Sequence, residues 1–300
     1  MALIRNDFIL RLRSASSAAV FLLGTICASG FQSPASPRAA AAAPSVPAAV
    51  PASSPAIATV SGPRINPPSS NYSYPDAQTF TYAVDWRLMS AGRATLRVDT
   101  VNGERHIVAN ADSIGAVALL YHVHDRLETF FNPQTNCSLV LTKHTEEGFR
   151  RIETGIRYDY ARKKAVLDER NVRAKNQKHE ENDVPSCVTN TLAAAYYVAS
   201  QPLLQGTSFS FPTSDGGKTA DIAVAVEARE DVKTPAGSYK TIRISAEALS
   251  GPQKGKGKVW MWYSDDARHI PVQMRARAFW GTLTFQLAQI NSGAADRIGQ

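Results

Sequence analysis

Two histidines stand one residue apart, at His122 and His124. On a strand, alternate side chains point to the same face, so these imidazoles would form a pair suited to a metal ion. His144 or Asp125 would have to supply the third ligand from another part of the chain. Because only two ligands are local, we favour histidines that are solvated or packed in a core, and we predict neither a metal nor another cofactor.

Cys137 and Cys187 are the two cysteines that remain once the first 30 residues are set aside. An even pair in an oxidising compartment predicts a disulfide. Closing the loop of about 50 residues between them would stabilise the fold by roughly 4 kcal/mol in the loop-entropy description. A nucleophilic Cys187 with His179 as its base is the weaker alternative, because His179 lies in a charged segment expected to be mobile.

Aromatic side chains offer a candidate binding surface for an apolar ligand. Tyr82 and Trp86 share one alternation register near the start of the domain, and Trp260 and Trp262 share another near its end. Each pair is therefore expected on one face of a strand, where it either packs in a core or lines a ligand cavity. We take these four residues as the candidate lining of such a cavity.

Sequence signatures of several enzyme classes are missing: the chain has no nucleophile elbow, phosphate-binding loop, dinucleotide-binding glycine pattern or HExxH. The net charge is +7, but residues 75–300 carry only +3 of it, which excludes an electrostatic nucleic-acid binder. We therefore favour a domain without catalytic activity over an enzyme, and we assign no catalytic residue.

Alternating hydrophobic residues predict strands over most of residues 75–300. The alternation is strict at residues 80–88 and 152–160, and it recurs at residues 222–226. The dipeptide at residues 102–103, Asn-Gly, is a hairpin signal. Sequential strands joined by short turns imply an antiparallel sheet.

Three segments interrupt this pattern. Residues 188–199 are rich in Ala and are followed by Pro202, which predicts a helix. Residues 114–121 are expected to form a helical turn, and residues 168–183 a solvated, charged loop. The fold class is therefore predicted to be mainly β, with a curved antiparallel sheet or open half-barrel packed on one central helix.

Residues 1–30 are predicted to be a secretory signal peptide. Three arginines precede a short uncharged, apolar stretch that ends in small residues. Ile26 is too large for the position before a lipidated cysteine, so we expect Cys27 to leave with the signal peptide. The protein is thus expected in the periplasm or otherwise exported, and to meet a membrane only through an uncleaved or lipidated N-terminus.

Residues 31–74 are predicted to be a disordered linker. They are mostly Ala, Pro and Ser, and they hold nine of the 17 prolines of the chain. With few large apolar side chains, such a segment cannot offset the entropy cost of ordering. Residues 75–300 are then expected to form a single, mainly β domain.

Two stretches of the C-terminal half resemble a known family. Residues 228–242 read AREDVKTPAGSYKTI, and residues 259–272 read VWMWYSDDARHIPV. They are similar to the Thr-Pro-Ala-Gly turn and to the Trp-x-Ser-Asp-Asp-x-Arg-x-Pro-Val strand pair of bacterial domain-of-unknown-function family 3108. Residues 80–92 resemble the opening hairpin of that family, and residues 192–198 resemble its central helix.

The resemblance implies an exported, mainly β domain of the bacterial envelope, and it supplies no activity or catalytic residue. The Asp that precedes the central helix in the family is Thr189 or Asn190 here. The Arg that follows the helix is absent, with Ser200 near its place. Any role that depends on this polar pair is therefore in doubt for this chain.

Three functional hypotheses follow. The first is a non-catalytic binding or carrier domain that holds an apolar, lipid-like or other envelope ligand in the concave face of the sheet. The alternative is an envelope scaffold or protein-interaction domain, and an unrecognised hydrolase is less favoured. A deep apolar cavity would support the carrier, whereas a filled core with an exposed apolar patch would support the interaction domain.

Overall fold

Fourteen antiparallel strands form one sheet in the computed structural model, which describes residues 63–87, 89–278 and 281–293. The predicted signal peptide, residues 1–30, and residues 31–62 lie outside the described residues. The strands are β1 (Gln78–Trp86), β2 (Met89–Val101), β3 (Glu104–Ser113), β4 (Val123–Phe131), β5 (Ser138–Glu147), β6 (Arg150–Asp159), β7 (Lys164–Asn171), β8 (Asn176–Asp183), β9 (Ser208–Thr213), β10 (Ala220–Thr234), β11 (Gly237–Ala248), β12 (Lys258–Ser264), β13 (Pro271–Ala278) and β14 (Gly281–Ser292). The helices are α2 (Gly115–Leu120) and α3 (Thr191–Ala199).

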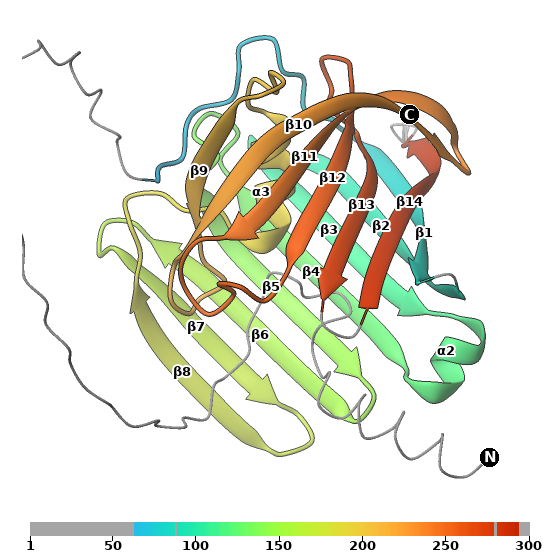
Figure 1. Ribbon diagram of the computed structural model, residues 1–300. Helices are drawn as coiled ribbons and strands as arrows, with labels where there is room; N and C mark the ends of the chain where they lie inside the picture. The colour runs from blue at the N-terminus through green and yellow to red at the C-terminus, as the bar shows by residue number, and fades with distance from the viewer. Residues whose placement is uncertain (1–62, 88, 279–280, 294–300) are drawn as a thin grey trace, which may run out of the picture.

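The strand order is β8-β7-β6-β5-β4-β3-β2-β1-β14-β13-β12-β11-β10-β9. Two meanders are therefore joined where β1 pairs with β14, and the open edges are β8 and β9. Figure 1 shows the sheet curling so that both meanders face α3. The prediction of a mainly β fold built on a curved antiparallel sheet is confirmed, and none of the helices in the described ranges is long and apolar enough to cross a membrane.

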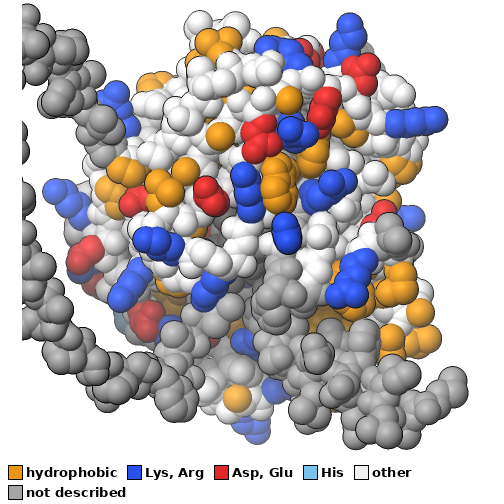
Figure 2. All heavy atoms as spheres, in the orientation of Figure 1, with side chains coloured by type: hydrophobic (Ala, Val, Ile, Leu, Met, Phe, Trp, Pro, Cys, Tyr) orange, Lys and Arg blue, Asp and Glu red, His pale blue; other side chains and the backbone are white. Residues whose placement is uncertain are grey.

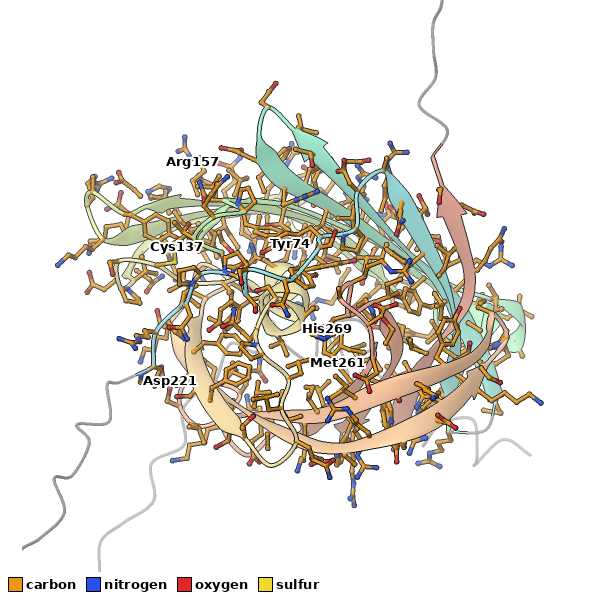
Figure 3. The ribbon with its side chains drawn as sticks, turned by 90° about the horizontal axis from the view of Figure 1, so that it is seen from above. Tyr74, Cys137, Arg157, Asp221, Met261 and His269 are labelled. Atoms are coloured by element: carbon orange, nitrogen blue, oxygen red, sulfur yellow. A yellow bond between two sulfur atoms is a disulfide. The ribbon has the colours of Figure 1, made fainter. Side chains whose placement is uncertain are left out.

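Helix α3 fills the inside of the curve because it is apolar on all sides. Ala193 and Tyr196 pack with the core of β1–β4 and β14, whereas Tyr197 and Val198 pack with the core of β9–β12. A helix without a polar face is stable only when both sides are covered. Figure 3 shows α3 enclosed by the sheet, with Met261 inside the curve and Arg157 on the outside.

The helix begins at an Asn cap. The Asn190 side chain accepts hydrogen bonds from the backbone N–H groups of Leu192 and Ala193, which satisfies two donors that the first turn leaves free. Its amide also donates to Thr129 Oγ1 at 2.6 Å and Ser138 Oγ at 3.0 Å, so the cap is tied to β4 and β5.

Residues 63–74 pack on α3, although the sequence placed them in the disordered linker. Ser69 N donates to the Ser200 carbonyl at 2.7 Å, and Tyr72 and Tyr74 pack against the two cores that flank the helix. Although the segment is rich in Pro, it contains aromatic side chains whose burial offsets the entropy cost of ordering this short stretch.

Residues 168–183 form strands and not the solvated loop that their charge suggested. They make up the end of β7 and the whole of β8, which pair antiparallel from Lys164↔Asp183 to Asn171↔Asn176. Ala165 and Leu167 supply the buried face of β7, while the outer face carries ion pairs such as His179–Asp168. Cross-strand charged pairs of this kind stabilise an edge strand, which therefore does not need the apolar alternation of strands inside the sheet.

Candidate functional site

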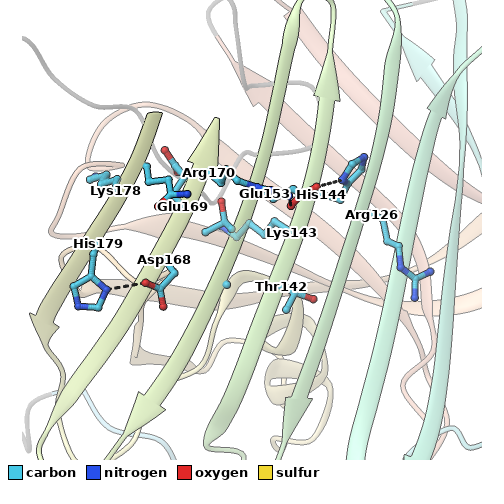
Figure 4. Close-up of a pocket in the computed structure, with 13 residues that line it drawn as sticks. Arg126, Thr142, Lys143, His144, Glu153, Asp168, Glu169, Arg170, Lys178 and His179 are labelled. Carbon is cyan, nitrogen blue, oxygen red and sulfur yellow. Dashed lines mark hydrogen bonds and ion pairs between the residues drawn. The ribbon is translucent and has the colours of Figure 1, made fainter. Parts of the chain in front are cut away.

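A polar hollow crosses the outer face of β4 to β8, on the side of the sheet away from α3 (Figure 4). Its volume is about 700 Å³. The register aligns Thr142, Gly155, Asp168 and His179 across four strands, and places Arg126, His144, Glu153 and Arg170 in the neighbouring row. The lining comprises Arg126, Thr142, Lys143, His144, Glu153, Thr154, Gly155, Asp168, Glu169, Arg170, Gln177, Lys178 and His179.

Gly155 provides the low floor of the hollow. A Cβ atom at this position would meet nothing within 4 Å, so the space above the backbone is open. Strands normally disfavour glycine, because it has no side chain to pack, and one common reason for its presence is an approach by another molecule. The long side chains of Arg126 and Arg170 stand beside this floor, on the same face of the sheet as Gly155.

Charges of opposite sign pair across the strands of the hollow. His179 Nδ1 lies 2.7 Å from Asp168 Oδ1, and Arg170 lies 2.6 Å from Glu153 Oε2. The hydrogen bond from Arg170 holds the pKa of the Glu153 carboxyl below its usual value. The surface therefore presents both donors and acceptors, which suits a hydrophilic ligand or the polar surface of a partner rather than an apolar molecule.

The predicted disulfide is present. Cys137 and Cys187 are bonded, with 50 residues of sequence separation. The bond joins the segment that enters β5 to the segment that leads into α3, and Ser138 N donates to the Val188 carbonyl directly beside it at 2.9 Å. It thereby fixes the start of the buried helix to the sheet.

The four candidate cavity residues lie on opposite faces of the sheet. Tyr82 is buried inside the curve, where its hydroxyl donates to the Pro271 carbonyl at 2.9 Å, and Trp86 follows in the same alternation. Met261 and Tyr263 take the inner positions of β12, so Trp260 and Trp262 face outward. Because the two pairs are on different faces, the structure does not bring them together into one cavity.

Trp262 is nevertheless well held on the outer face. Its indole N–H donates to Glu230 Oε1 at 2.5 Å, and the Arg275 guanidinium lies 5.6 Å from the ring centroid. Lys258 stands over the Trp260 ring at 5.4 Å. Alternation had shown that each pair shares a face, but it could not show which face.

The residues considered for a metal site are also separated. His124 points outward and lies 2.6 Å from Asp112 Oδ1, and His144 points outward toward Glu146. Asp125 points inward and is fully buried, and His122 precedes β4. Among the described residues, no group of three or more His, Cys, Asp or Glu side chains could hold a metal ion.

Two buried charged clusters on the inner face were not found from the sequence. Asp125 and Glu147 lie together on β4 and β5, and burial followed by repulsion from Glu147 raises the pKa of Asp125 to about 7. Lys143 Nζ forms an ion pair with Asp215 Oδ2 at 2.6 Å, with both side chains almost fully buried. Their burial could have been recognised from the two-residue repeat of β5, which places Lys143 and Glu147 on the same face as the buried Leu141.

The profile of the family described as Protein of unknown function (DUF3108) matches residues 81–288. The chain belongs to this family. None of the curated proteins matches the sequence.

Several solved structures match this chain at low sequence identity. A beta-barrel-like protein of domain of unknown function DUF1849 from Brucella abortus superposes with a TM-score of 0.53 at 8% identity, covering 74% of this chain and 99% of that chain. A protein from Bacteroides fragilis, provisionally described as exported with a YmcC-like fold, gives a TM-score of 0.33 at 11% identity, with coverages of 73% and 98%. A protein from Parabacteroides distasonis, provisionally described as a lipoprotein, gives 0.34 at 10% identity, with coverages of 74% and 98%. The first likeness concerns the fold alone.

Proposed function

We propose that this DUF3108 member is an exported, non-catalytic interaction domain of the cell envelope, which binds a hydrophilic partner through the outer face of β4 to β8. The observation that carries the proposal is the hollow of about 700 Å³ lined by paired charges of both signs. A disulfide between Cys137 and Cys187 supports export, because such bonds persist in oxidising compartments.

The concave face supports an interaction domain better than a carrier. Helix α3 occupies the inside of the curve, and buried side chains from both meanders pack against Tyr196 and Tyr197. The aromatic residues that motivated an apolar cavity are divided between the two faces. A packed interior leaves binding to the outer surfaces, of which the hollow is a concave and polar one.

Site-specific photocrosslinking in cells tests this proposal. A photoreactive residue at Thr142, which is exposed in the hollow, is expected to give a discrete adduct, whereas the same residue at exposed Ser238, the second residue of β11, is expected to give none. Equal adducts at both positions, or no adduct at Thr142, would overturn the proposal.

A matched pair of charge reversals tests the chemistry of the contact. Arg170→Glu is expected to reduce the Thr142 adduct at least about tenfold, because it replaces one member of the Arg170–Glu153 pair by a like charge. Arg97→Glu is the control, since Arg97 is equally exposed and paired with Asp99 on β2, away from the hollow. Native mass spectrometry of the exported protein adds a separate check, because a bound mass extractable into organic solvent would favour the carrier instead.

A further inference from the structure

Four connections lie side by side at one end of the sheet, and we call their described residues the hairpin end: residues 87 and 89, 114–122, 148–149 and 172–175. Hydrogen bonds link this row: Ile114 N donates to the Ala91 carbonyl, Gly148 N to the His122 carbonyl, and Val172 N to the Arg151 carbonyl. Figure 1 shows these connections along the lower right and bottom of the molecule, with α2 among them. The hairpin end is thus a continuous rim formed by β1 to β8.

Large apolar side chains are concentrated on this rim. Nine are exposed among the described residues, and six of them belong to the hairpin end. Leu119 is 89% exposed and Phe149 is 78% exposed. The six are Met89, Ile114, Leu119, Leu120, Phe149 and Val172. Figure 2 shows hydrophobic side chains gathered at the lower right, where α2 lies.

Helix α2 is apolar throughout, although it lies at the surface beside β2. Its sequence is GAVALL, and none of its residues is buried. Apolar side chains exposed singly are ordinary, but a group of them on adjoining connections marks a surface that meets an apolar phase or partner.

The charged residues of the hairpin end are all basic. Arg87, Arg173 and Lys175 lie in the connections, whereas Arg150 and Arg151 at the start of β6 stand beside Glu146 and Glu147 at the end of β5. No Asp or Glu occurs within the described residues of these four connections. The Arg173 guanidinium lies 5.7 Å from the Phe149 ring centroid, and Arg151 also contacts Glu146 at 3.3 Å.

We propose that the hairpin end docks on the surface of an anionic lipid bilayer. The tips of Leu119, Leu120 and Phe149 would enter the boundary between headgroups and acyl chains, and the basic side chains would contact anionic headgroups. Charge complementarity favours this occupant, because connections that carry basic and no acidic residues match a uniformly negative surface. The six exposed apolar side chains belong to four adjoining connections, so they can meet a fluid, planar phase together.

Local insertion is measured with a tryptophan placed on the rim of the full-length chain. Leu119→Trp is compared with Leu204→Trp, because Leu204 is 60% exposed and lies outside the hairpin end. Vesicles of phosphatidylcholine with phosphatidylglycerol, prepared with brominated acyl chains, serve as the probe. The Leu119→Trp signal, taken as a difference from the unsubstituted chain, is expected to shift to the blue and to be quenched at least about threefold more than that of Leu204→Trp.

The electrostatic part is tested separately. Combining Leu119→Trp with Arg173→Gln and Lys175→Gln is expected to raise the lipid concentration for half-maximal quenching by about tenfold, since each basic group near an anionic surface favours binding. Vesicles of phosphatidylcholine alone are expected to give little quenching. The apolar N-terminal stretch is present in every variant, so tethering through it alone would quench both tryptophans equally.

Three results would overturn the proposal. Equal quenching of the two tryptophans would place the contact elsewhere, and absent quenching of Leu119→Trp would exclude insertion. A blue shift that grows with protein concentration and needs no vesicles would show that the hairpin end binds a second copy of the chain instead.

Discussion

The ammonium group of Lys143, on β5, lies 2.6 Å from the Asp215 carboxylate, in the connection between β9 and β10. The same carboxylate accepts hydrogen bonds from the backbone N–H of Thr191 at 3.0 Å and from its hydroxyl at 2.8 Å. The buried Asp215 carboxylate therefore links three parts of the fold. Asp215 itself belongs to the meander of β9 to β14, and it contacts β5 of the other meander and the first turn of α3. This contact fastens the two meanders at the end of the helix where the sheet is open.

Removal of the cation from this cluster is expected to destabilise the fold. Lys143→Met leaves Asp215 buried without its counter-charge, so the free energy of unfolding should fall by about 3–5 kcal/mol. Adding Asp215→Asn should restore part of this loss, because the neutral amide oxygen still accepts from Thr191. Urea unfolding of the single and double variants measures both effects. A double variant no more stable than Lys143→Met would contradict this assignment.

The disulfide is expected to contribute mainly through the unfolded chain. Cys137→Ser with Cys187→Ser opens a closed loop of 50 residues, which should lower the unfolding free energy by about 4 kcal/mol. Thermal unfolding of the oxidised protein, the reduced protein and the double variant measures this contribution. The reduced protein and the double variant should agree closely. A loss below about 1 kcal/mol would show that residues 137–187 remain constrained after unfolding.

Strands with one buried face could be predicted from the sequence, and β1 is an example. Phe80, Tyr82 and Val84 alternate with less buried residues, and the structure places all three in the interior. The central helix was equally visible, because an Ala-rich segment without a polar face fits only an enclosed position. The cysteine pair followed from its number and from the predicted compartment.

Other features depend on which segments meet in three dimensions. Trp262 alternates as a core residue does, yet it is on the outer face, where Glu230 and Arg275 hold it. Lys143 is in a buried register position, but only the fold reveals Asp215 as its partner. Similarly, β8 lacks an apolar alternation, because as an edge strand it is stabilised by its ladder and by charged pairs with β7. Period alone therefore identifies strands and leaves their faces and partners undetermined.

Gly216 next to the buried anion is expected to tolerate no side chain. Its φ angle is +84°, and an added Cβ would lie 2.8 Å from Leu167 Cδ1 and 3.0 Å from Ile156 Cγ1. Gly216→Ala should therefore lower the unfolding free energy by about 1–3 kcal/mol through strain and crowding. Gly217→Ala is the control, since nothing lies within 4 Å of a Cβ there. Equal losses for the two variants, measured by urea unfolding, would contradict a role for this close approach.

The carboxyl pair of Asp125 and Glu147 predicts a pH dependence of stability. Burial, and then repulsion from Glu147, raises the pKa of Asp125 to about 7 in the folded protein, against about 4 in an unfolded chain. Between these two values the folded state holds a proton that the unfolded state lacks. The contribution of Asp125 to stability is therefore fully present below about pH 4 and is lost as the pH rises through 7.

Asp125→Asn should remove this dependence, because an amide keeps both the acceptor for Glu146 N and a donor toward Glu147. Relative to the variant, the unsubstituted protein should lose on the order of 2–4 kcal/mol of unfolding free energy between pH 4 and pH 8. Urea unfolding across this range measures the difference, with Asp231→Asn as a control at an exposed carboxylate. Parallel pH profiles for the unsubstituted protein and Asp125→Asn would mean that Asp125 is ionised in the folded state, with its charge balanced by neighbouring groups.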